Sequence, residues 1–190
     1  PAEARTLDLR RTQGLSLEEC AKYLVEVQAV AKIGEFEQLR TSLLACVSLY
    51  GEHFAQVEMR EQLAAGVRDA WHVMPVAFRV ELLLGMALAA KDHDDKGTGS
   101  SLLAEVDEIL GAHEWSQPQL YLPLLAEVAA ARFAMGDEPR ALQLVAQGQA
   151  AFQADVGRVA NIYHARAMRP LAEVLVKMGE TKRALAVFDT

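Results

Sequence analysis

The sequence holds few of the residues that build covalent or metal-linked frameworks. Its 190 residues include only two cysteines, Cys20 and Cys46, and each lies in a segment whose apolar residues recur at helical spacing. A cysteine in such a segment is typically a small, buried, reduced thiol. We therefore expect neither a disulfide framework nor a zinc framework.

Long hydrophobic runs are also missing. The most apolar stretch, 80–90, is interrupted by Glu81 and is far shorter than the roughly 20 residues that a membrane-spanning helix needs. Residues 1–14 mix charged with isolated apolar side chains and contain no hydrophobic signal core. We interpret them as an N-terminal tail or linker, and we expect a cytoplasmic protein that does not bind membranes.

Positive charge is scarce. The chain has 19 basic and 26 acidic residues, which give a formal net charge of -7. Such a balance opposes the phosphate backbone of nucleic acids and the surface of anionic membranes. We therefore expect no nucleic-acid partner.

Aromatic residues make up only 6% of the chain while apolar residues make up 52%, so its core should be mainly aliphatic. Apolar residues recur at three- and four-residue spacing in nearly every segment, and the alternation typical of strands is absent. This pattern predicts an all-α protein of about eight or nine helices. The first should start after Ser16, because Glu19 completes a capping box, and Gly34 should end it.

Turn residues divide the rest of the chain into further predicted helices. The glycine-rich stretch 91–101 is the clearest predicted loop, Pro118 suits a first helical turn, and Pro123 should kink its helix or delay the start. Pro170 should kink the helix that ends near Met178. The predicted helices are 36–50, 55–74, 76–90, 102–110, one from Gln117, one after Gly136, one from Gly157 to Met178 and one after Gly179.

Two turns repeat 43 residues apart. In each, a glycine and an acidic residue are followed four residues later by alanine, and Gly34 begins a weaker relative. The glycine permits a left-handed turn between antiparallel helices, the acid caps the positive end of the next helix, and the alanine allows close packing. The two repeats comprise Gly136, Asp137 and Ala141, and Gly179, Glu180 and Ala184.

These residues resemble the glycine-acid turn of the tetratricopeptide repeat (TPR) family, in a long-helix variant whose period of 43 residues exceeds the family's usual period of about 34. The resemblance is clearest over 118–190. It implies a right-handed α-solenoid of antiparallel helix pairs across a TPR-like repeat domain at 15–190.

The motifs of common catalytic and metal sites are missing. No two of the five histidines lie three or four residues apart, and the acidic stretch 92–97 has Lys96 at a calcium-ligand position and Leu103 where a glutamate is needed. The glycine-rich stretch 97–101 lacks the lysine of a phosphate loop. We therefore predict no catalytic residue, metal or cofactor, and no enzyme.

A polar stripe stands out on the helix that contains Pro170. Its members recur at three- and four-residue spacing: Arg166, Arg169, Glu173 and Lys177. The TPR resemblance implies that this face lines a concave groove, where Gln28 and Lys32 of the first helix would also lie, and that the arginines bind an acidic group of a partner. The alternative is a solvated helix face or a set of internal salt bridges.

The leading functional hypothesis is a non-catalytic scaffold that binds a partner peptide or domain in this groove, as part of a larger protein. A second hypothesis is self-association, with homodimers formed through an apolar end at the last helix. A third is a helical-fold enzyme of unknown reaction, which would need a polar pocket of converging titratable groups.

Overall fold

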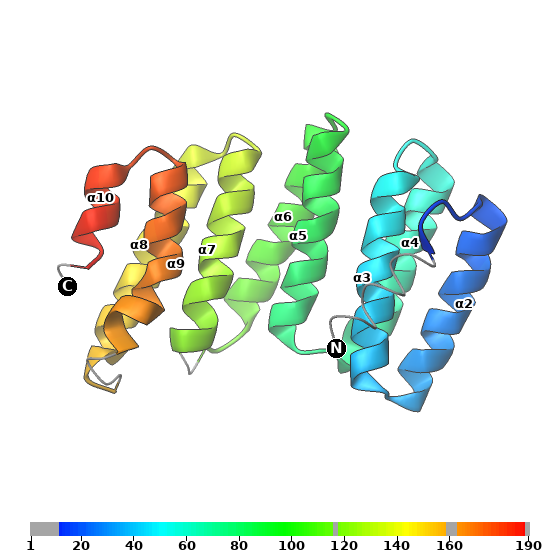
Figure 1. The fold of residues 1–190 in the computed structure, drawn as a ribbon, viewed down its shortest axis with the longest axis horizontal. Coiled ribbons are helices and arrows are strands. Elements are labelled where there is room, and N and C mark those ends of the chain that lie inside the picture. Colours follow the sequence, from blue (N-terminus) through cyan, green and yellow to red (C-terminus); the bar gives the residue numbers. More distant parts are fainter. Residues whose placement is uncertain (1–11, 116–117, 159–162, 189–190) are drawn as a thin grey trace. The chain divides into compact units, whose positions relative to one another are not determined.

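The structure is a computed structural model that describes residues 12–115, 118–158 and 163–188. Within these ranges the chain is all-α and contains nine α-helices, of which eight are 14 to 18 residues long (Figure 1). Neighbouring helices pack in antiparallel pairs. The predicted helix class and number are confirmed. The tail predicted at 1–14 lies mostly outside the described residues.

The chain divides into two compact units, residues 1–102 and 103–190, each of which is described by itself. In the first unit α2 packs against α3 and α4, and α3 packs against α5. The helix α6 (Lys96–Ala112) begins in this unit and continues into the second. The other elements of the first unit are α2 (Leu17–Ile33), α3 (Phe36–Glu52), α4 (Val57–Ala70), a 3₁₀ turn (Trp71–Val73) and α5 (Val76–Asp92).

Local signals define both ends of α2. The Ser16 side chain accepts a hydrogen bond from the Glu19 backbone, and the Glu19 carboxylate accepts one from the Ser16 backbone at 2.8 Å, so the predicted capping box is present. Gly34 ends the helix with φ of 80°, in the left-handed region that glycine occupies without steric cost. Between these two ends the helix buries the side chains of Cys20, Tyr23 and Val27.

The loop predicted over 91–101 is wrong in extent. Helix α5 continues to Asp92, α6 begins at Lys96, and only three residues form the turn. Asp95 explains the early start of α6, because its carboxylate accepts hydrogen bonds from Thr98 N at 2.9 Å and Thr98 Oγ1 at 2.7 Å. These bonds lower the pKa of Asp95. This cap, with Leu102 and Leu103 buried further along α6, outweighs the low helix propensity of the Gly and Ser residues.

In the second unit α7 packs against both α8 and α9, and α10 packs against α9. Pro118 begins α7 as predicted, and Pro123 lies inside the helix without delaying its start. Gly148 of α8 lets the Leu171 side chain approach closely: a Cβ at this position would lie 2.8 Å from Leu171 Cδ1. The elements that follow α6 are α7 (Pro118–Ala134), α8 (Glu138–Asp155), a 3₁₀ turn (Val156–Arg158), α9 (His164–Lys177) and α10 (Thr181–Ala186).

The two repeated turns share their glycine conformation but differ in the acid. Gly136 and Gly179 have φ of 86° and 80°, as the left-handed turn requires. Asp137 caps α8, since its side chain accepts a hydrogen bond from the Arg140 backbone. Glu180 makes no such bond and instead faces Arg183 at 3.6 Å, so the prediction that it caps the last helix is wrong. Glutamate is one methylene longer than aspartate, which caps well.

The alanines that follow these turns, Ala141 and Ala184, are both buried. Their small side chains leave room for the adjoining helix, as the sequence predicted. The assignment of 15–190 to one repeat domain remains a prediction, as does the solenoid.

Candidate interaction surface

The predicted polar stripe lies on α9, the most clearly two-sided helix of the second unit. Its buried face consists of Met168, Leu171, Ala172, Val174 and Leu175. Arg166, Arg169, Glu173 and Lys177 are therefore exposed on the opposite side of the helix, as predicted.

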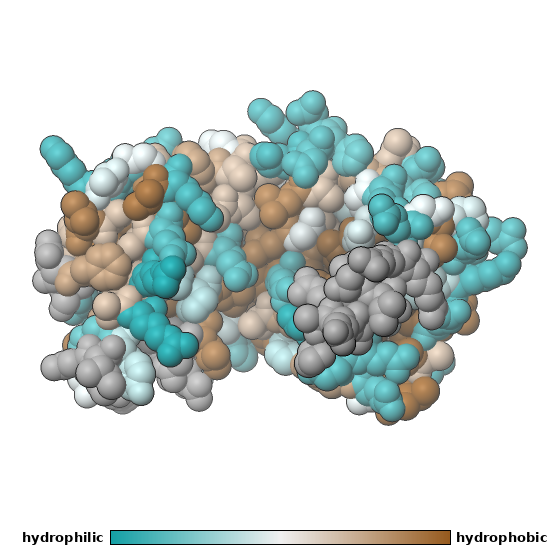
Figure 2. All heavy atoms as spheres, viewed as in Figure 1, coloured by the Kyte–Doolittle hydropathy of each residue, from teal (hydrophilic) through white to brown (hydrophobic). Residues whose placement is uncertain are grey.

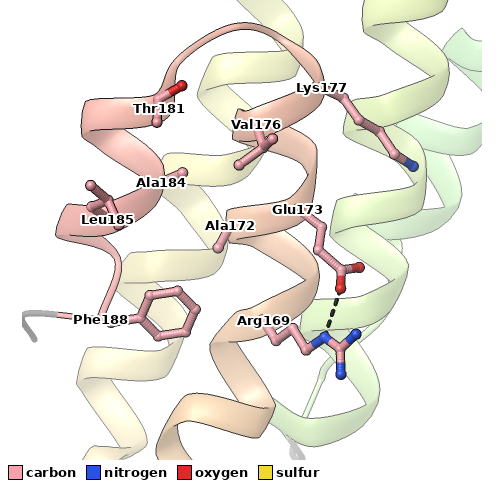
Figure 3. Close-up of a pocket in the computed structure, with 9 residues that line it drawn as sticks. All are labelled: Arg169, Ala172, Glu173, Val176, Lys177, Thr181, Ala184, Leu185 and Phe188. Carbon is pink, nitrogen blue, oxygen red and sulfur yellow. Dashed lines mark hydrogen bonds and ion pairs between the residues drawn. The ribbon is translucent and has the colours of Figure 1, made fainter.

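Three of the four stripe residues line a groove between α9 and α10 (Figure 3). The groove has a volume of about 600 Å³. Helix α9 contributes Arg169, Ala172, Glu173, Val176 and Lys177, and the chain from Thr181 onward contributes Thr181, Ala184, Leu185 and Phe188.

The floor and far wall of the groove are apolar. Val176, Leu185 and Phe188 are 57%, 66% and 49% exposed, although all three are large hydrophobic side chains. In Figure 3 the Val176 and Ala172 side chains lie on the side of α9 that faces α10, and the Phe188 ring points toward α9. The large exposed apolar side chains of α9 and of the chain from α10 onward thus lie in the hollow between the two helices.

The charged residues form one rim of the groove. Arg169 Nε donates to Glu173 Oε1 at 2.6 Å, and Figure 3 shows both side chains, with Lys177, on the side of α9 away from α10. Figure 2 shows the same arrangement as a hydrophilic column along α9 beside hydrophobic atoms over α10. Among the described residues Lys177 Nζ has no ion-pair partner, so the rim carries a net positive charge.

The remaining predicted site residues do not join this groove. Arg166 is exposed on α9 but does not line it. Gln28 and Lys32 are exposed on α2 in the first unit. The structure therefore brings together the part of the prediction that lies on one helix. The predicted contribution of Gln28 and Lys32, which depends on a groove that runs from one repeat to the next, remains a prediction.

Sequence reasoning missed the apolar half of the site. Leu185 and Phe188 were not singled out, because the sequence does not say which side of α10 faces α9. Val176 carried a usable signal, since a β-branched apolar residue falls between the charges of the stripe. A second, smaller hollow of about 420 Å³ lies in the first unit, lined by Leu17, Glu18, Gln56, Val57, Glu58, Met59 and Gln62.

Within the described ranges, no three His, Cys, Asp or Glu side chains gather in a way that could hold a metal ion. None of the helices described is both long and apolar enough to cross a bilayer. Comparison of the chain with family models, curated proteins and solved structures finds no match.

Proposed function

We propose that this chain is a non-catalytic protein-interaction module, built as a right-handed, TPR-like α-solenoid, whose α9–α10 groove binds a helix of a protein partner. The observation that carries the proposal is the groove itself, in which exposed Val176, Leu185 and Phe188 lie beside a charged rim. The repeated glycine turns at Gly136 and Gly179 and the antiparallel helix pairs support the solenoid.

A helix is the occupant that suits this surface. An amphipathic helix places an apolar stripe into a hydrophobic groove and keeps charged residues at its edge, and the groove offers the same two zones side by side. Each large apolar side chain that is covered contributes roughly 1 kcal/mol, since about half of the usual 1.5–3 kcal/mol for full burial remains to be gained.

The rim supports binding rather than catalysis. Its one carboxylate, Glu173, is 55% exposed and already paired with Arg169, which is 74% exposed. Catalytic groups usually act in water-excluded sites that shift their pKa. These side chains are placed to select a partner's charges at the edge of an apolar contact, where electrostatics contributes specificity.

A selection experiment tests the proposal. A library of displayed helical peptides would be selected on the wild-type chain and on Val176→Glu, with Glu108→Lys as a control change at an exposed residue outside the groove. We expect amphipathic peptides to be enriched by the wild type and the control but not by Val176→Glu. Enrichment of the same peptides by all three proteins, or of none, would refute the groove as a binding site.

A further inference from the structure

Helix α2 presents the same surface pattern as the rim of the groove, but with every charge inverted. Over nine residues the two helices share an alanine at the fourth position and a valine at the eighth, while the first, fifth and ninth positions are charged. In α2 these charged residues are Glu18, Lys22 and Glu26, and in α9 they are Arg169, Glu173 and Lys177. The shared apolar residues are Ala21 and Val25 in α2, and Ala172 and Val176 in α9.

The resemblance extends to the local geometry. In α2 Lys22 Nζ donates to Glu18 Oε1 at 2.6 Å, the same separation as between Arg169 and Glu173 in α9. Residues four apart on a helix lie on one face about 6 Å from each other. Each helix therefore carries three charges of alternating sign in a row, minus-plus-minus on α2 and plus-minus-plus on α9.

The outer face of α2 is also apolar and uncovered. Val25 and Ile33 are 68% and 74% exposed, the two highest values among the large hydrophobic side chains described. Ala21 and Ala29 continue the row at four-residue spacing and are exposed as well. This row and the charged row lie side by side on the same side of the helix.

From this complementarity we infer that the helix bound in the α9–α10 groove is α2 of a second copy of this chain, an inference that rests on the proposed function of the groove. In the register that pairs the charges, Ala21 and Val25 cover the apolar floor beside Ala172 and Val176. The three charges of α2 meet three opposite charges on α9. Because the apolar row lies on the same rotational side of the charged row in both helices, the charges and the apolar residues can meet at the same time only when the two helices run antiparallel.

The charges disfavour the simpler pairing of two identical faces. If α9 packed antiparallel on α9 of a second copy about a twofold axis at Glu173, then Glu173 would face its own copy and Arg169 would face Lys177. Two α2 helices would meet with like charges in the same way. Like charges held together across an interface suppress that partner, so the contact is between different faces, and each copy can give one helix and accept another.

The contact should be weak and dependent on salt. The surface buried by one helix in one groove is at or below about 1,200 Å² in total, which is the low end for specific interfaces. Its charges are exposed at the edge, with 69% and 79% of the Lys22 and Glu18 side chains accessible. We therefore expect association that grows with protein concentration and weakens as ionic strength rises.

Two charge-reversed variants test the inference by sedimentation velocity over a broad concentration range. The first, Glu18→Lys with Lys22→Glu and Glu26→Lys, inverts α2. The second, Arg169→Glu with Glu173→Lys and Lys177→Glu, inverts the rim. Each variant alone should associate at least about tenfold more weakly than the wild type, because like charges then meet. An equimolar mixture should associate again, since each inverted face fits the other variant's.

Matched controls separate charge pattern from net charge. Glu108→Lys and Lys96→Glu change the net charge by the same amounts as the two reversals, at exposed residues outside both faces, and should leave association unchanged. The chain with all six substitutions should associate like the wild type. A wild type that does not associate, or a mixture that remains as weak as its components, overturns the inference. If peptide selection on the groove still succeeds in that case, the proposed function stands without it.

Discussion

Asp107 joins three helices of the second unit, and its removal should have a large and specific cost. Its Oδ2 accepts a hydrogen bond from Arg132 Nη2 at 2.6 Å, and its Oδ1 accepts one from Arg140 Nη2 at 3.0 Å. These residues belong to α6, α7 and α8. The Arg132 side chain is only 11% exposed, so Asp107→Ala leaves a mostly buried guanidinium without its nearest carboxylate.

The expected cost follows from what Arg132 keeps. Breaking a fully buried ion pair by removing one partner costs about 3–5 kcal/mol. Here Arg132 still donates to the Leu103 carbonyl at 2.8 Å and contacts Asp137 at 3.3 Å, and Asp107 is 27% exposed. We therefore expect about 2 kcal/mol. At an m-value of about 1 kcal/mol/M in urea, the unfolding midpoint of this unit falls by about 2 M.

Trp115 provides the readout. It lies in the second unit and stacks on Tyr121 with a ring separation of 5.0 Å, so its fluorescence follows that unit once Trp71 is replaced by Phe. The control is the same Asp107→Ala change in an Arg132→Met background, where no buried charge is left behind. There the cost should fall below about 1 kcal/mol, as expected for the partly exposed pair with Arg140. Equal costs in both backgrounds would refute the reasoning.

Three smaller predictions concern packing, pH and thiol reactivity. Gly148→Ala should destabilise the protein by about 1–3 kcal/mol, because the new Cβ would meet Leu171. Gly111→Ala, which has open space around it, should instead stabilise it by about 0.4–1 kcal/mol. Thermal melts in which both variants shift the melting temperature in the same direction would contradict this prediction. Hydrogen bonds from Thr98 lower the pKa of Asp95, so the stability that the ionised Asp95 adds to the fold is present above about pH 4 and is lost as pH falls through the lower pKa of the folded state. Asp95→Ala should therefore flatten the acid side of a plot of stability against pH measured by circular dichroism. An unchanged acid side would count against the cap. Burial raises the pKa of the Cys20 thiol, which is 0% exposed. A thiol reagent should therefore label Cys20 only as fast as the first unit opens. Rapid labelling of the native chain would show that Cys20 is not buried.

The features that the sequence predicted best are those determined within a few residues. Ser16 with Glu19 needs only one helical turn to form its capping box, and a glycine between two helical segments needs only its own backbone freedom, as at Gly136. The predicted loop at 91–101 was wrong because it relied on local composition alone. Its Gly and Ser residues suggested a loop, while the Asp95 cap and the buried leucines that follow decided in favour of helix.

The candidate site shows a similar division. The charged row on α9 follows from helical spacing alone, and the sequence located it. Its apolar neighbour depends on how α10 packs against α9, which brings Leu185 and Phe188 into the groove and which no local pattern specifies. The inverted row on α2 was present in the sequence, but its meaning depends on exposure: Val25 at 68% is a surface residue rather than part of the core.

Hydrogen exchange measured on dilute and on concentrated wild-type protein tests the central claim most directly. If α2 of one copy occupies the α9–α10 groove of another, backbone amides in 17–33 and in 164–186 should become more protected as concentration rises, while those of the core helix at 76–92 should not change. Protection that stays constant in both segments at every concentration, or that rises elsewhere instead, would contradict the assignment of these two faces as the contact.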